Sequence, residues 1–472
     1  MTNENPQTTN LQTTTLQNPN LQNSNLQNPN LQMTPKQIVE FLDEYIIGQN
    51  EAKKAIAIAL RNRYRRMILP KEVQEEITPK NILMIGSTGV GKTEIARRMA
   101  KIMHLPFVKV EASKYTEVGF VGRDVESMVR DLVNASIALV QKEYQSKNEQ
   151  KIQDYIIDKI TRALLPPLPN SVSEDKKREY ETSFAKMRQK VIKGENDHLK
   201  IDIEISKKGE LNELENGMPP DIIKVQESII KVLSKSESIK KTLTIKEAKQ
   251  ALKTEAQEHT LDMEEIKLEG LKRAESSGVI FIDEIDKIAT SSKDSRADPS
   301  KEGVQRDLLP IIEGSNVATK FGNIKTDYIL FVAAGAFHLS KPSDLIPELQ
   351  GRFPLRVELD SLSEETMLKI LTQPKNSLIT QYQHLLSVEG LEIDFEVEAL
   401  EALAHFAYLA NQKTEDIGAR RLHTVLERVL EDISFSADEY AKKNPKIKID
   451  KSLIEQKLSN LVENADMSRY IL

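Results

Sequence analysis

The chain has 472 residues, of which 39% are hydrophobic and 29% charged, and its net charge is −6. This length is enough for two or three domains, and no apolar run reaches the ~18 residues of a membrane-spanning helix. The absence of cysteine excludes disulfides and thiolate metal sites, and the acidic balance argues against a protein that binds a nucleic-acid backbone. No signal peptide opens the sequence, so we expect a cytoplasmic protein.

Residues 1–32 are rich in Asn and Gln and repeat a five-residue unit that begins at Leu16, Leu21 and Leu26. This segment has too few apolar side chains to offset the entropy lost on ordering, so we expect a disordered arm. A short solenoid is the alternative, although a few pentapeptides cannot close a core. The recognisable folded chain begins at Met33.

Two helices are expected before the first strand. Thr34 and Pro35 are typical of the start of a helix that runs through Asp43, and a second helix is expected from Asn50 to Met67. Four arginines, at positions 61, 63, 65 and 66, lie near the end of the second helix. They are open to three interpretations: a solvated helix end, a subunit or nucleotide contact, and a nucleic-acid patch.

The stretch Gly86-Ser87-Thr88-Gly89-Val90-Gly91-Lys92-Thr93 has the G-x-x-x-x-G-K-T pattern of a P-loop. It lies between an apolar strand, residues 82–85, and a helical run, residues 94–101, as that motif requires. Backbone N–H groups of such a loop converge on phosphate, and the following helix adds its positive end. We therefore expect Lys92 to pair with the β- and γ-phosphates of a nucleotide and Thr93 to ligate Mg²⁺.

A second strand, residues 107–110, leads into the sequence Gly119-Phe120-Val121-Gly122. An aromatic residue and a valine between two glycines favour a loop that grips a generic ligand. An ordinary tight turn with Phe120 in the core is the competing interpretation.

An insertion is expected between the P-loop and the next motif, because their separation far exceeds what neighbouring strands need. Residues 138–258 are rich in Lys, Glu, Gln and Ser, with helical periodicity over residues 152–160 and 222–233. The polar stretch 170–217 between them shows only one strand-like segment, residues 200–205. We interpret residues 138–258 as a separate, mostly helical insertion with a flexible middle, flanked by core segments 33–137 and 259–360.

The sequence Val279-Ile280-Phe281-Ile282-Asp283-Glu284 is an apolar strand that ends in two carboxylates. This Walker B pattern predicts that Asp283 holds Mg²⁺ and that Glu284 polarises the attacking water. General-base assistance of this kind is worth ~10² to 10⁴ in rate. A polar strand end without catalytic function is the alternative interpretation.

A further buried strand is expected at residues 328–335, followed by the helix end Pro347-Glu348-Leu349-Gln350-Gly351-Arg352. A tethered surface arginine is the plain interpretation of Arg352. From Ser361 onward the chain is predicted to be helical, with only residues 446–450 resembling a strand. Within it, Arg420 and Arg421 fall in the first turn of a helix, which is unfavourable for the helix dipole unless an anion lies nearby.

Together these motifs resemble the AAA+ protein unfoldases of the Clp/Hsp100 group. The resemblance is close over residues 33–140 and 259–472 and weak through the insertion, which corresponds to the intermediate domain of that family. It implies an α/β fold with an AAA+ P-loop NTPase core around a parallel sheet. It also implies an inserted, mostly helical intermediate domain and a C-terminal helical lid domain, residues 361–472.

The resemblance further implies roles for individual residues and a homohexameric ring that uses ATP and Mg²⁺. Arg420 would be the sensor-2 arginine, and Arg352 an arginine finger, with Glu348 beside it, that completes a neighbouring subunit's site. The remaining nucleotide contacts would come from an adenine pocket and the phosphate loop: Ile46, Ile47, Gly89, Val90, Gly91, Lys92, Thr93 and Glu94.

The function that the resemblance implies is ATP-driven unfolding of unfolded or tagged proteins and their translocation into a separate partner peptidase. Phe120 stands where this family usually carries tyrosine, and the strand at 328–334 ends in small apolar residues where many AAA+ proteins have a polar sensor. No peptidase constellation is visible, so we expect no cleavage by this chain. A nucleic-acid motor or loader and a non-proteolytic remodelling chaperone are the alternatives.

The chain end carries three bulky apolar residues in the sequence Arg469-Tyr470-Ile471-Leu472. Burial against the lid helices is one interpretation. The resemblance favours another, in which the tail inserts between subunits of the partner peptidase and activates it.

Overall fold

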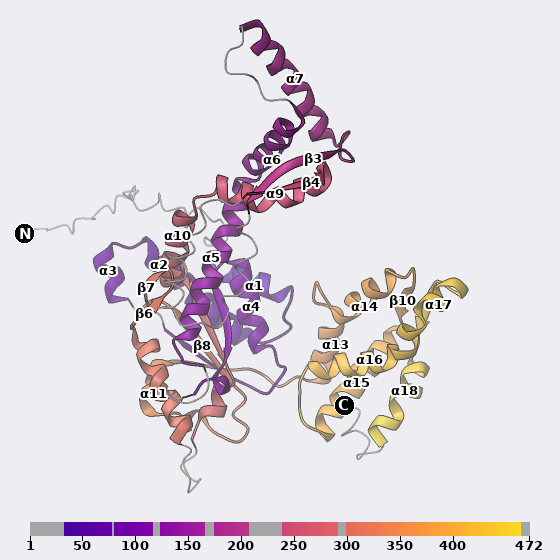
Figure 1. Cartoon of the computed structure of the whole chain (residues 1–472). Coiled ribbons are helices and arrows are strands. Elements are labelled where there is room, and N and C mark those ends of the chain that lie inside the picture. The colour runs from indigo at the N-terminus through magenta and orange to yellow at the C-terminus, as the bar shows by residue number, and fades with distance from the viewer. Residues whose placement is uncertain are drawn as a thin grey trace, which may run out of the picture. The chain divides into compact units, whose positions relative to one another are not determined.

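The computed structural model describes residues 33–77, 80–116, 123–165, 174–206, 238–290 and 299–463 (Figure 1). The predictions for the arm at 1–32, for Gly119, Phe120, Val121 and Gly122, for the helical run at 222–233 and for the tail at 469–472 lie outside the described residues. No helix within the described ranges is long and apolar enough to cross a membrane.

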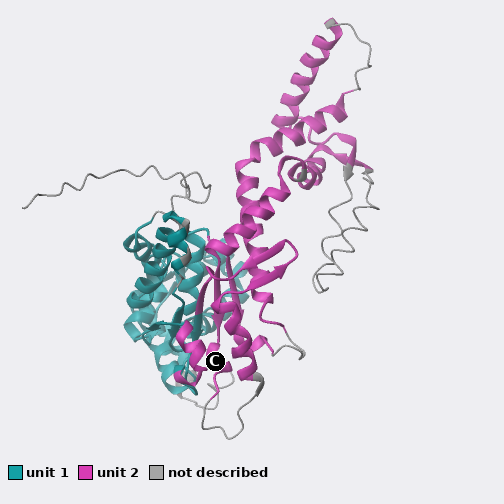
Figure 2. Cartoon of the chain, turned by 90° about the vertical axis from the view of Figure 1, so that its left-hand side faces the viewer, with its two compact units in different colours: residues 1–104, 333–342, 353–472 teal, residues 105–332, 343–352 magenta. Residues whose placement is uncertain are grey.

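The chain divides into two compact units, both discontinuous in sequence (Figure 2). Unit 1 comprises residues 1–104, 333–342 and 353–472, and unit 2 comprises residues 105–332 and 343–352. The P-loop therefore belongs to unit 1 and the Walker B strand to unit 2.

Unit 1 contains the first helices, the P-loop strand and the C-terminal helices. Its elements are α1 (Pro35–Asp43), α2 (Asn50–Ile68), α3 (Lys71–Glu76), β1 (Ile82–Ile85), α4 (Lys92–Ile102), β9 (Leu355–Glu358), α13 (Glu364–Thr372), α14 (Leu378–Ser387), β10 (Glu392–Phe395), α15 (Val397–Lys413), α16 (Arg420–Phe435), α17 (Ala437–Lys443), β11 (Lys446–Ile449) and α18 (Lys451–Glu463). The predicted start of α1 is confirmed, because Thr34 and Gln37 form a reciprocal capping box.

Unit 2 contains the Walker B strand and the insertion. Its elements are β2 (Phe107–Glu111), η4 (Ala112–Lys114), α5 (Ser127–Lys147), α6 (Glu149–Leu164), α7 (Glu174–Lys193), β3 (Lys200–Ser206), β4 (Ser238–Thr244), α9 (Ile245–Thr260), α10 (Met263–Ser277), β5 (Val279–Asp283), η6 (Ile285–Ile288), α11 (Pro299–Glu313), β6 (Asn316–Thr319), β7 (Gly322–Lys325) and α12 (Pro347–Arg352). Strand β8 (Leu330–Gly335) and the short helix η7 (Pro342–Asp344) contribute residues to both units.

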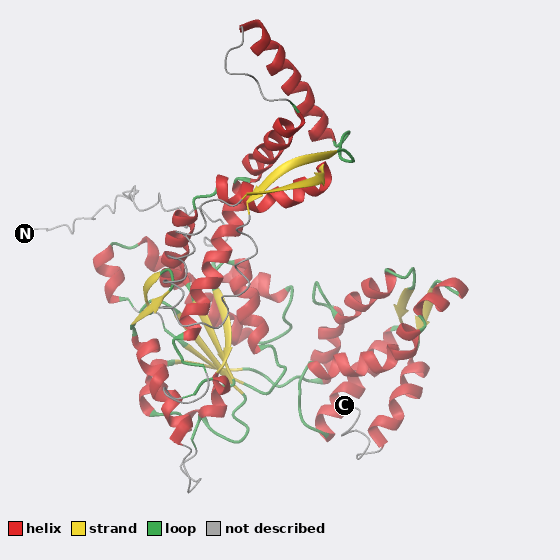
Figure 3. Ribbon diagram, viewed as in Figure 1, coloured by secondary structure: helices red, strands yellow, loops and turns green. Residues whose placement is uncertain are grey.

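The central sheet has five strands in the hydrogen-bonded order β2-β5-β8-β1-β9 (Figure 3). Within the units, β1 pairs with β9 and β2 pairs with β5, both in parallel. All six residues of β8 and the first four of β5 are buried, as expected for parallel strands covered on both faces. The predicted α/β fold with a parallel sheet is confirmed.

The insertion has an apolar core of its own, built from α6, α7, α9 and the antiparallel pair of β3 and β4. Its buried residues are Ile152, Ile156, Ile160, Val191, Ile201, Ile203, Ile245, Ala248, Leu252 and Ala256. The expectation of a flexible stretch at 170–217 was wrong for residues 174–193, which form helix α7. Helices α5 and α9 run through residues 138 and 258, so the division of the chain into domains stays a proposal.

The C-terminal helices of unit 1 enclose a second apolar core, to which α13, α15, α16 and α18 contribute. The prediction of a single strand-like segment in this region was incomplete. Strand β11 pairs in parallel with β10, from Glu392 opposite Lys446 to Phe395 opposite Ile449. The alternation of polar and apolar residues over β10 is the signal that the sequence prediction missed.

Candidate nucleotide-binding and hydrolysis site

The P-loop connects β1 to α4, and two left-handed glycines set its backbone. Gly89 has φ +78° and Gly91 has φ +105°. A Cβ at Gly89 would lie 2.0 Å from the carbonyl oxygen of Ile417, whereas a Cβ at Gly91 would meet nothing within 4 Å. Gly89 is therefore required by a close backbone approach as well as by its φ, and Gly91 by its φ alone.

Lys92 lies at the start of α4 with its ammonium directed into the loop. Its Nζ donates to Gly86 O at 2.5 Å and to Ser87 O at 2.7 Å. The hydroxyl of Ser87 is buried and has no hydrogen-bond partner within the described part of the chain. A cation, an unpartnered hydroxyl and glycine N–H groups at the start of an 11-residue helix together fit a bound phosphate group.

Glu94 lies in the first turn of α4, where its carboxylate accepts hydrogen bonds from Arg97 and Arg98. Burial acts to raise the pKa of Glu94, but the two arginines outweigh it and hold the pKa below its ordinary value. The guanidinium carbon of Arg98 also lies 4.2 Å from the centre of the Tyr45 ring. The segment before α2 and the P-loop helix are thus tied together.

Residues 46–49 lie against the P-loop through a glutamine that the sequence analysis did not single out. Gln49, which is left-handed with φ +57° and only 4% exposed, donates from Nε2 to Val90 O at 3.4 Å and to Asp360 O at 2.9 Å. Its Oε1 accepts from Asp360 N at 2.9 Å. Ile46 is buried and Ile47 half-buried, so the two residues predicted for the adenine pocket lie in a segment anchored beside the phosphate loop.

The turn before α16 contacts the P-loop backbone to backbone. Gly418 has φ +60°, and a Cβ on it would lie 2.5 Å from Thr88 O. Ala419 N donates to Gly89 O at 3.2 Å. Arg420, the first residue of α16, is exposed next to this contact. Unit 1 therefore brings the predicted sensor-2 arginine to the turn that touches the phosphate loop.

Arg421 has a different role from the one its position suggested. Its guanidinium donates to Asn411 Oδ1 at 3.1 Å, to Thr414 Oγ1 at 2.7 Å and to Glu415 O at 2.9 Å. Asn411 Nδ2 in turn donates to Gly418 O at 3.0 Å. Burial lowers the pKa of Arg421, whose residue is only 2% exposed. The carboxylates of Asp416 and Glu415 act in the opposite direction and favour the charged guanidinium, which agrees with the expectation of anions near this helix start.

In unit 2, Asp283 and Glu284 lie at the carboxyl end of β5. Asp283 pairs with Lys109 at 2.8 Å and accepts the backbone N–H of Glu284 at 3.1 Å. Glu284 is exposed and left-handed, with φ +56°, a conformation that costs an L-residue roughly 1–2 kcal/mol. Ser113 Oγ donates to Glu284 Oε2 at 3.2 Å. The Glu284 carboxylate thus lies at the surface and accepts a hydrogen bond from Ser113.

Glu348 and Arg352 lie one turn apart on the short helix α12, and both are exposed. The guanidinium of Arg352 contacts Glu313, at the end of α11, with N–O distances of 2.8 Å and 2.7 Å. The arginine side chain remains 50% exposed. It is therefore tethered within its own chain and still accessible at the surface.

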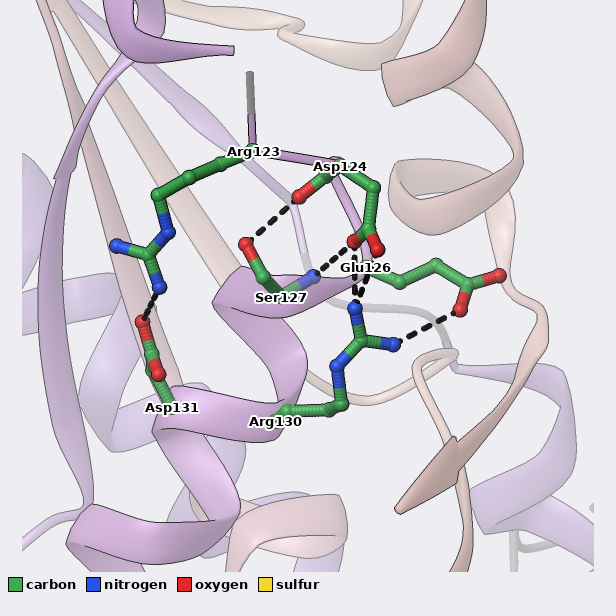
Figure 4. Close-up of polar contacts among 6 residues, drawn as sticks. All are labelled: Arg123, Asp124, Glu126, Ser127, Arg130 and Asp131. Atoms are coloured by element: carbon green, nitrogen blue, oxygen red, sulfur yellow. Dashed lines mark hydrogen bonds and ion pairs between the residues drawn. The ribbon is translucent and has the colours of Figure 1, made fainter. Parts of the chain in front are cut away.

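The segment after residue 122 is held to α5 by hydrogen bonds and ion pairs (Figure 4). Thr116 N donates to Arg123 O at 3.3 Å, which closes the base of this segment. Arg123 pairs with Asp131 at 2.6 Å, and Arg130 pairs with Asp124 at 2.6 Å. The flanks of the predicted substrate loop are thus anchored by ion pairs on the first turns of a 21-residue helix.

Two AAA domain families match this chain. The AAA domain of the Cdc48 subfamily matches residues 199–356, and the ATPase family associated with various cellular activities matches residues 82–163. Both matches cover nucleotide-site motifs, the P-loop in the second and the Walker B strand in the first.

Several whole proteins are similar to this chain along nearly their full length. The ATP-dependent protease ATPase subunit HslU of Helicobacter pylori strain G27 is 66% identical over 442 residues, which is 93% of this chain and 99% of that protein. The corresponding protein of Helicobacter acinonychis strain Sheeba is 65% identical with the same coverage. That of Campylobacter jejuni is 62% identical over 93% of this chain and 100% of its own length.

Identity at this level extends the earlier resemblance from separate motifs to 93% of the chain. The chain is an AAA+ ATPase that binds nucleotide, as its P-loop geometry and the two domain matches indicate. It belongs to the HslU family, the ATPase subunits of ATP-dependent proteases.

Proposed function

We propose that this protein forms a homohexameric ring that uses ATP to unfold substrate proteins, binds unfolded or tagged chains, and translocates them into a separate HslV-type peptidase, which it activates. The observation that carries this proposal is the 62–66% identity, over 93% of the chain, to proteins named as the ATPase subunit of an ATP-dependent protease. The site of action is the cytoplasm, and neither nucleic acid nor membrane is involved.

ATP with Mg²⁺, when bound, supplies the phosphoanhydride whose hydrolysis drives the cycle. The N–H groups of Gly89, Val90, Gly91, Thr93 and Glu94, together with the Lys92 ammonium, hold the phosphates. Ile46 and Ile47 cover the adenine, and Arg420 reaches the nucleotide from the turn that contacts Gly89. The support for this assignment is the contact of these segments within unit 1.

Thr93 and Asp283 are the residues that would hold Mg²⁺. Glu284 orients and polarises the attacking water, a contribution worth ~10² to 10⁴ in rate. Its support is the place of Glu284 directly after the Walker B strand, with an exposed carboxylate that accepts a hydrogen bond from Ser113.

Arg352 acts on the site of the neighbouring subunit, where it stabilises charge that develops on the transferred phosphoryl group, with Glu348 beside it. An arginine supplied in trans is worth ~10³ to 10⁵ in rate in related NTPases. The half-exposed guanidinium and its tether to Glu313 support this role, since the group is both held and presented outward.

Substrate is gripped by Gly119, Phe120, Val121 and Gly122, and the tail residues Arg469, Tyr470, Ile471 and Leu472 dock on the peptidase. A mixture of the full-length chain, an HslV-type peptidase, ATP and a tagged folded substrate tests this function. We expect ATP-dependent degradation that Phe120→Tyr retains and Phe120→Ala loses, with basal ATP hydrolysis spared in both. Failure of the parent chain to stimulate the peptidase would refute the proposal, and a lowered melting temperature of Phe120→Ala would indicate core packing.

Removal of residues 469–472 tests the tail separately. We expect ring assembly and basal hydrolysis to persist while stimulation of the peptidase is lost, and a synthetic tail peptide to activate the peptidase in part. Loss of ring stability, or full stimulation without the tail, would instead favour a tail buried on the lid helices and a remodelling chaperone without a peptidase.

A further inference from the structure

A glutamine buried in the middle of α11 joins two segments that each lead to a proposed catalytic group. Gln305 is 0% exposed. A buried carboxamide is costly unless both its donor and its acceptor are used, so its partners define its role.

Both ends of this carboxamide are bonded to backbone. Nε2 donates to Ile288 O at 2.7 Å, and Oε1 accepts from Ile346 N at 2.8 Å. Ile288 is the last residue of η6, the short helix that begins directly after Glu284. Ile346 directly precedes Pro347, the first residue of α12, which ends at Arg352. One side chain therefore connects the turn after the Walker B strand to the base of the arginine helix.

Three further contacts link α12 and the turn before it to each other and to their neighbours. Thr290 N donates to Asp344 O at 3.2 Å, which adds a second link between the two segments. Gln350 Nε2 donates to Leu345 O at 2.7 Å, and this closes the turn onto the helix. Arg352 itself contacts Glu313 on α11. Hydrogen bonds therefore connect the turn at Ile288 to α12 through Gln305 and the segment before α12.

We propose that Gln305 is a positioning residue for Arg352. Its two hydrogen bonds hold the start of α12, the helix that carries Arg352, against the turn that follows Glu284. This inference rests on the proposed action of Arg352 on a neighbouring subunit. The position of Arg352 at the neighbouring subunit's site then depends on the position of the turn after Glu284 in its own subunit. A neutral side chain that donates and accepts at once is needed, because the two backbone partners are a carbonyl and an N–H.

The test uses full-length Gln305→Met, which keeps the length of the side chain and loses both hydrogen bonds. In rings made only of this variant we expect the turnover number to fall ~10-fold or more, because small misplacement of a catalytic group is costly. The dissociation constant for ATP should stay within about twofold of the parent, since the P-loop is untouched. Gln381→Met, the same change at an exposed position of α14, is the matched control and should leave both unchanged.

Dilution into an excess of Glu284→Gln subunits separates positioning of Arg352 from a general defect. A diluted Gln305→Met subunit receives its arginine from a Glu284→Gln neighbour, so its site should hydrolyse as fast as a parent site diluted in the same way. Persistence of the deficit on dilution, or no deficit in pure rings, would overturn the role of Gln305. If Arg352→Ala subunits diluted identically are not rescued either, it is the trans assignment of Arg352 that fails.

Gln305→Glu provides a second measurement. Burial raises the pKa of a carboxyl, and the protonated form can donate and accept as the amide does. Turnover relative to the parent should therefore rise for Gln305→Glu as the pH falls from 8 to 6 and stay constant for Gln305→Met. Equal, pH-independent ratios for the two variants would contradict the hydrogen-bonded link.

Discussion

The nucleotide-binding region of unit 1 and the hydrolytic region of unit 2 are built in opposite ways. Around the P-loop, Lys92, Gly418 and Arg421 are buried and bonded to backbone oxygens or packed against them. In unit 2, Glu284 and Arg352 are exposed, with Glu284 accepting a hydrogen bond from Ser113 and Arg352 paired with Glu313. The buried residues around the P-loop are thus bonded within unit 1, whereas the two residues proposed to act in hydrolysis are exposed.

The largest effect is expected from Arg352→Ala. Loss of a trans arginine should reduce ATP turnover by ~10³-fold or more, while ATP affinity and ring assembly stay near normal because α12 is exposed. Arg306→Ala, which removes an exposed arginine paired with Glu302 on α11, is the matched control and should have little effect. Turnover at saturating ATP and the dissociation constant give both quantities. An equal loss of ATP affinity would place Arg352 in its own chain's binding site.

A smaller loss is expected for Glu284→Gln, which should lower turnover by ~10²-fold or more and retain ATP binding. Lys92→Ala should instead mainly weaken ATP binding, because the Lys92 ammonium lies in the buried phosphate-binding loop. Equilibrium binding of a fluorescent nucleotide and steady-state hydrolysis separate the two variants. Near-normal turnover of Glu284→Gln would remove this carboxylate from its assigned role.

Arg421→Ala tests whether the buried network behind Gly418 supports nucleotide binding. Without the guanidinium, the buried side-chain oxygen of Asn411 and the carbonyl oxygen of Glu415 lose a donor, which costs ~1–3 kcal/mol and loosens the turn on the P-loop. We expect weaker ATP binding by ~10-fold and a lower melting temperature, corresponding to that range of energies. Arg428→Ala, on an exposed face of the same helix, should change neither. Identical behaviour of the two variants would mean that the network carries no binding function.

The smallest effect concerns the pH dependence of stability at Glu94. Its pKa is lower in the folded protein than in the unfolded chain, so the ion pairs with Arg97 and Arg98 stabilise the fold at neutral pH. This contribution is present above the ordinary carboxyl pKa and is lost as the pH falls through the lowered value. Glu94→Gln should therefore cost less than about 1 kcal/mol at pH 7, a difference that disappears in acid. A difference that grows in acid would contradict the sign of the shift.

The sequence predicted those parts of the site whose residues are neighbours along the chain. The P-loop and Asp283-Glu284 are local patterns, in which strand, turn and helix signals coincide. Gln49 could not be found in this way, because its partner Asp360 is 311 positions away. Gln305 was missed for a different reason. A glutamine inside a helix normally faces solvent, so its sequence position gave no sign of burial.

Arg421 shows what a local rule leaves out. The dipole argument treats a helix end as isolated, yet here the guanidinium also donates to the side chain of Asn411 on α15 and to the backbone carbonyl of Glu415. Strand β10 was missed because its partner β11 lies some fifty positions further on, and a short alternation gains meaning only once that partner is known. Tertiary contacts decided both cases.

Mixed rings test most directly whether Arg352 acts on the site of a neighbouring subunit. Arg352→Ala and Glu284→Gln subunits are each expected to be nearly inactive in pure rings. In a mixed ring, some sites combine the intact Arg352 of a Glu284→Gln subunit with the intact Glu284 of an Arg352→Ala subunit. ATP turnover should therefore recover to a measurable fraction of the parent rate. Well-mixed rings that remain as inactive as either pure variant would contradict the account.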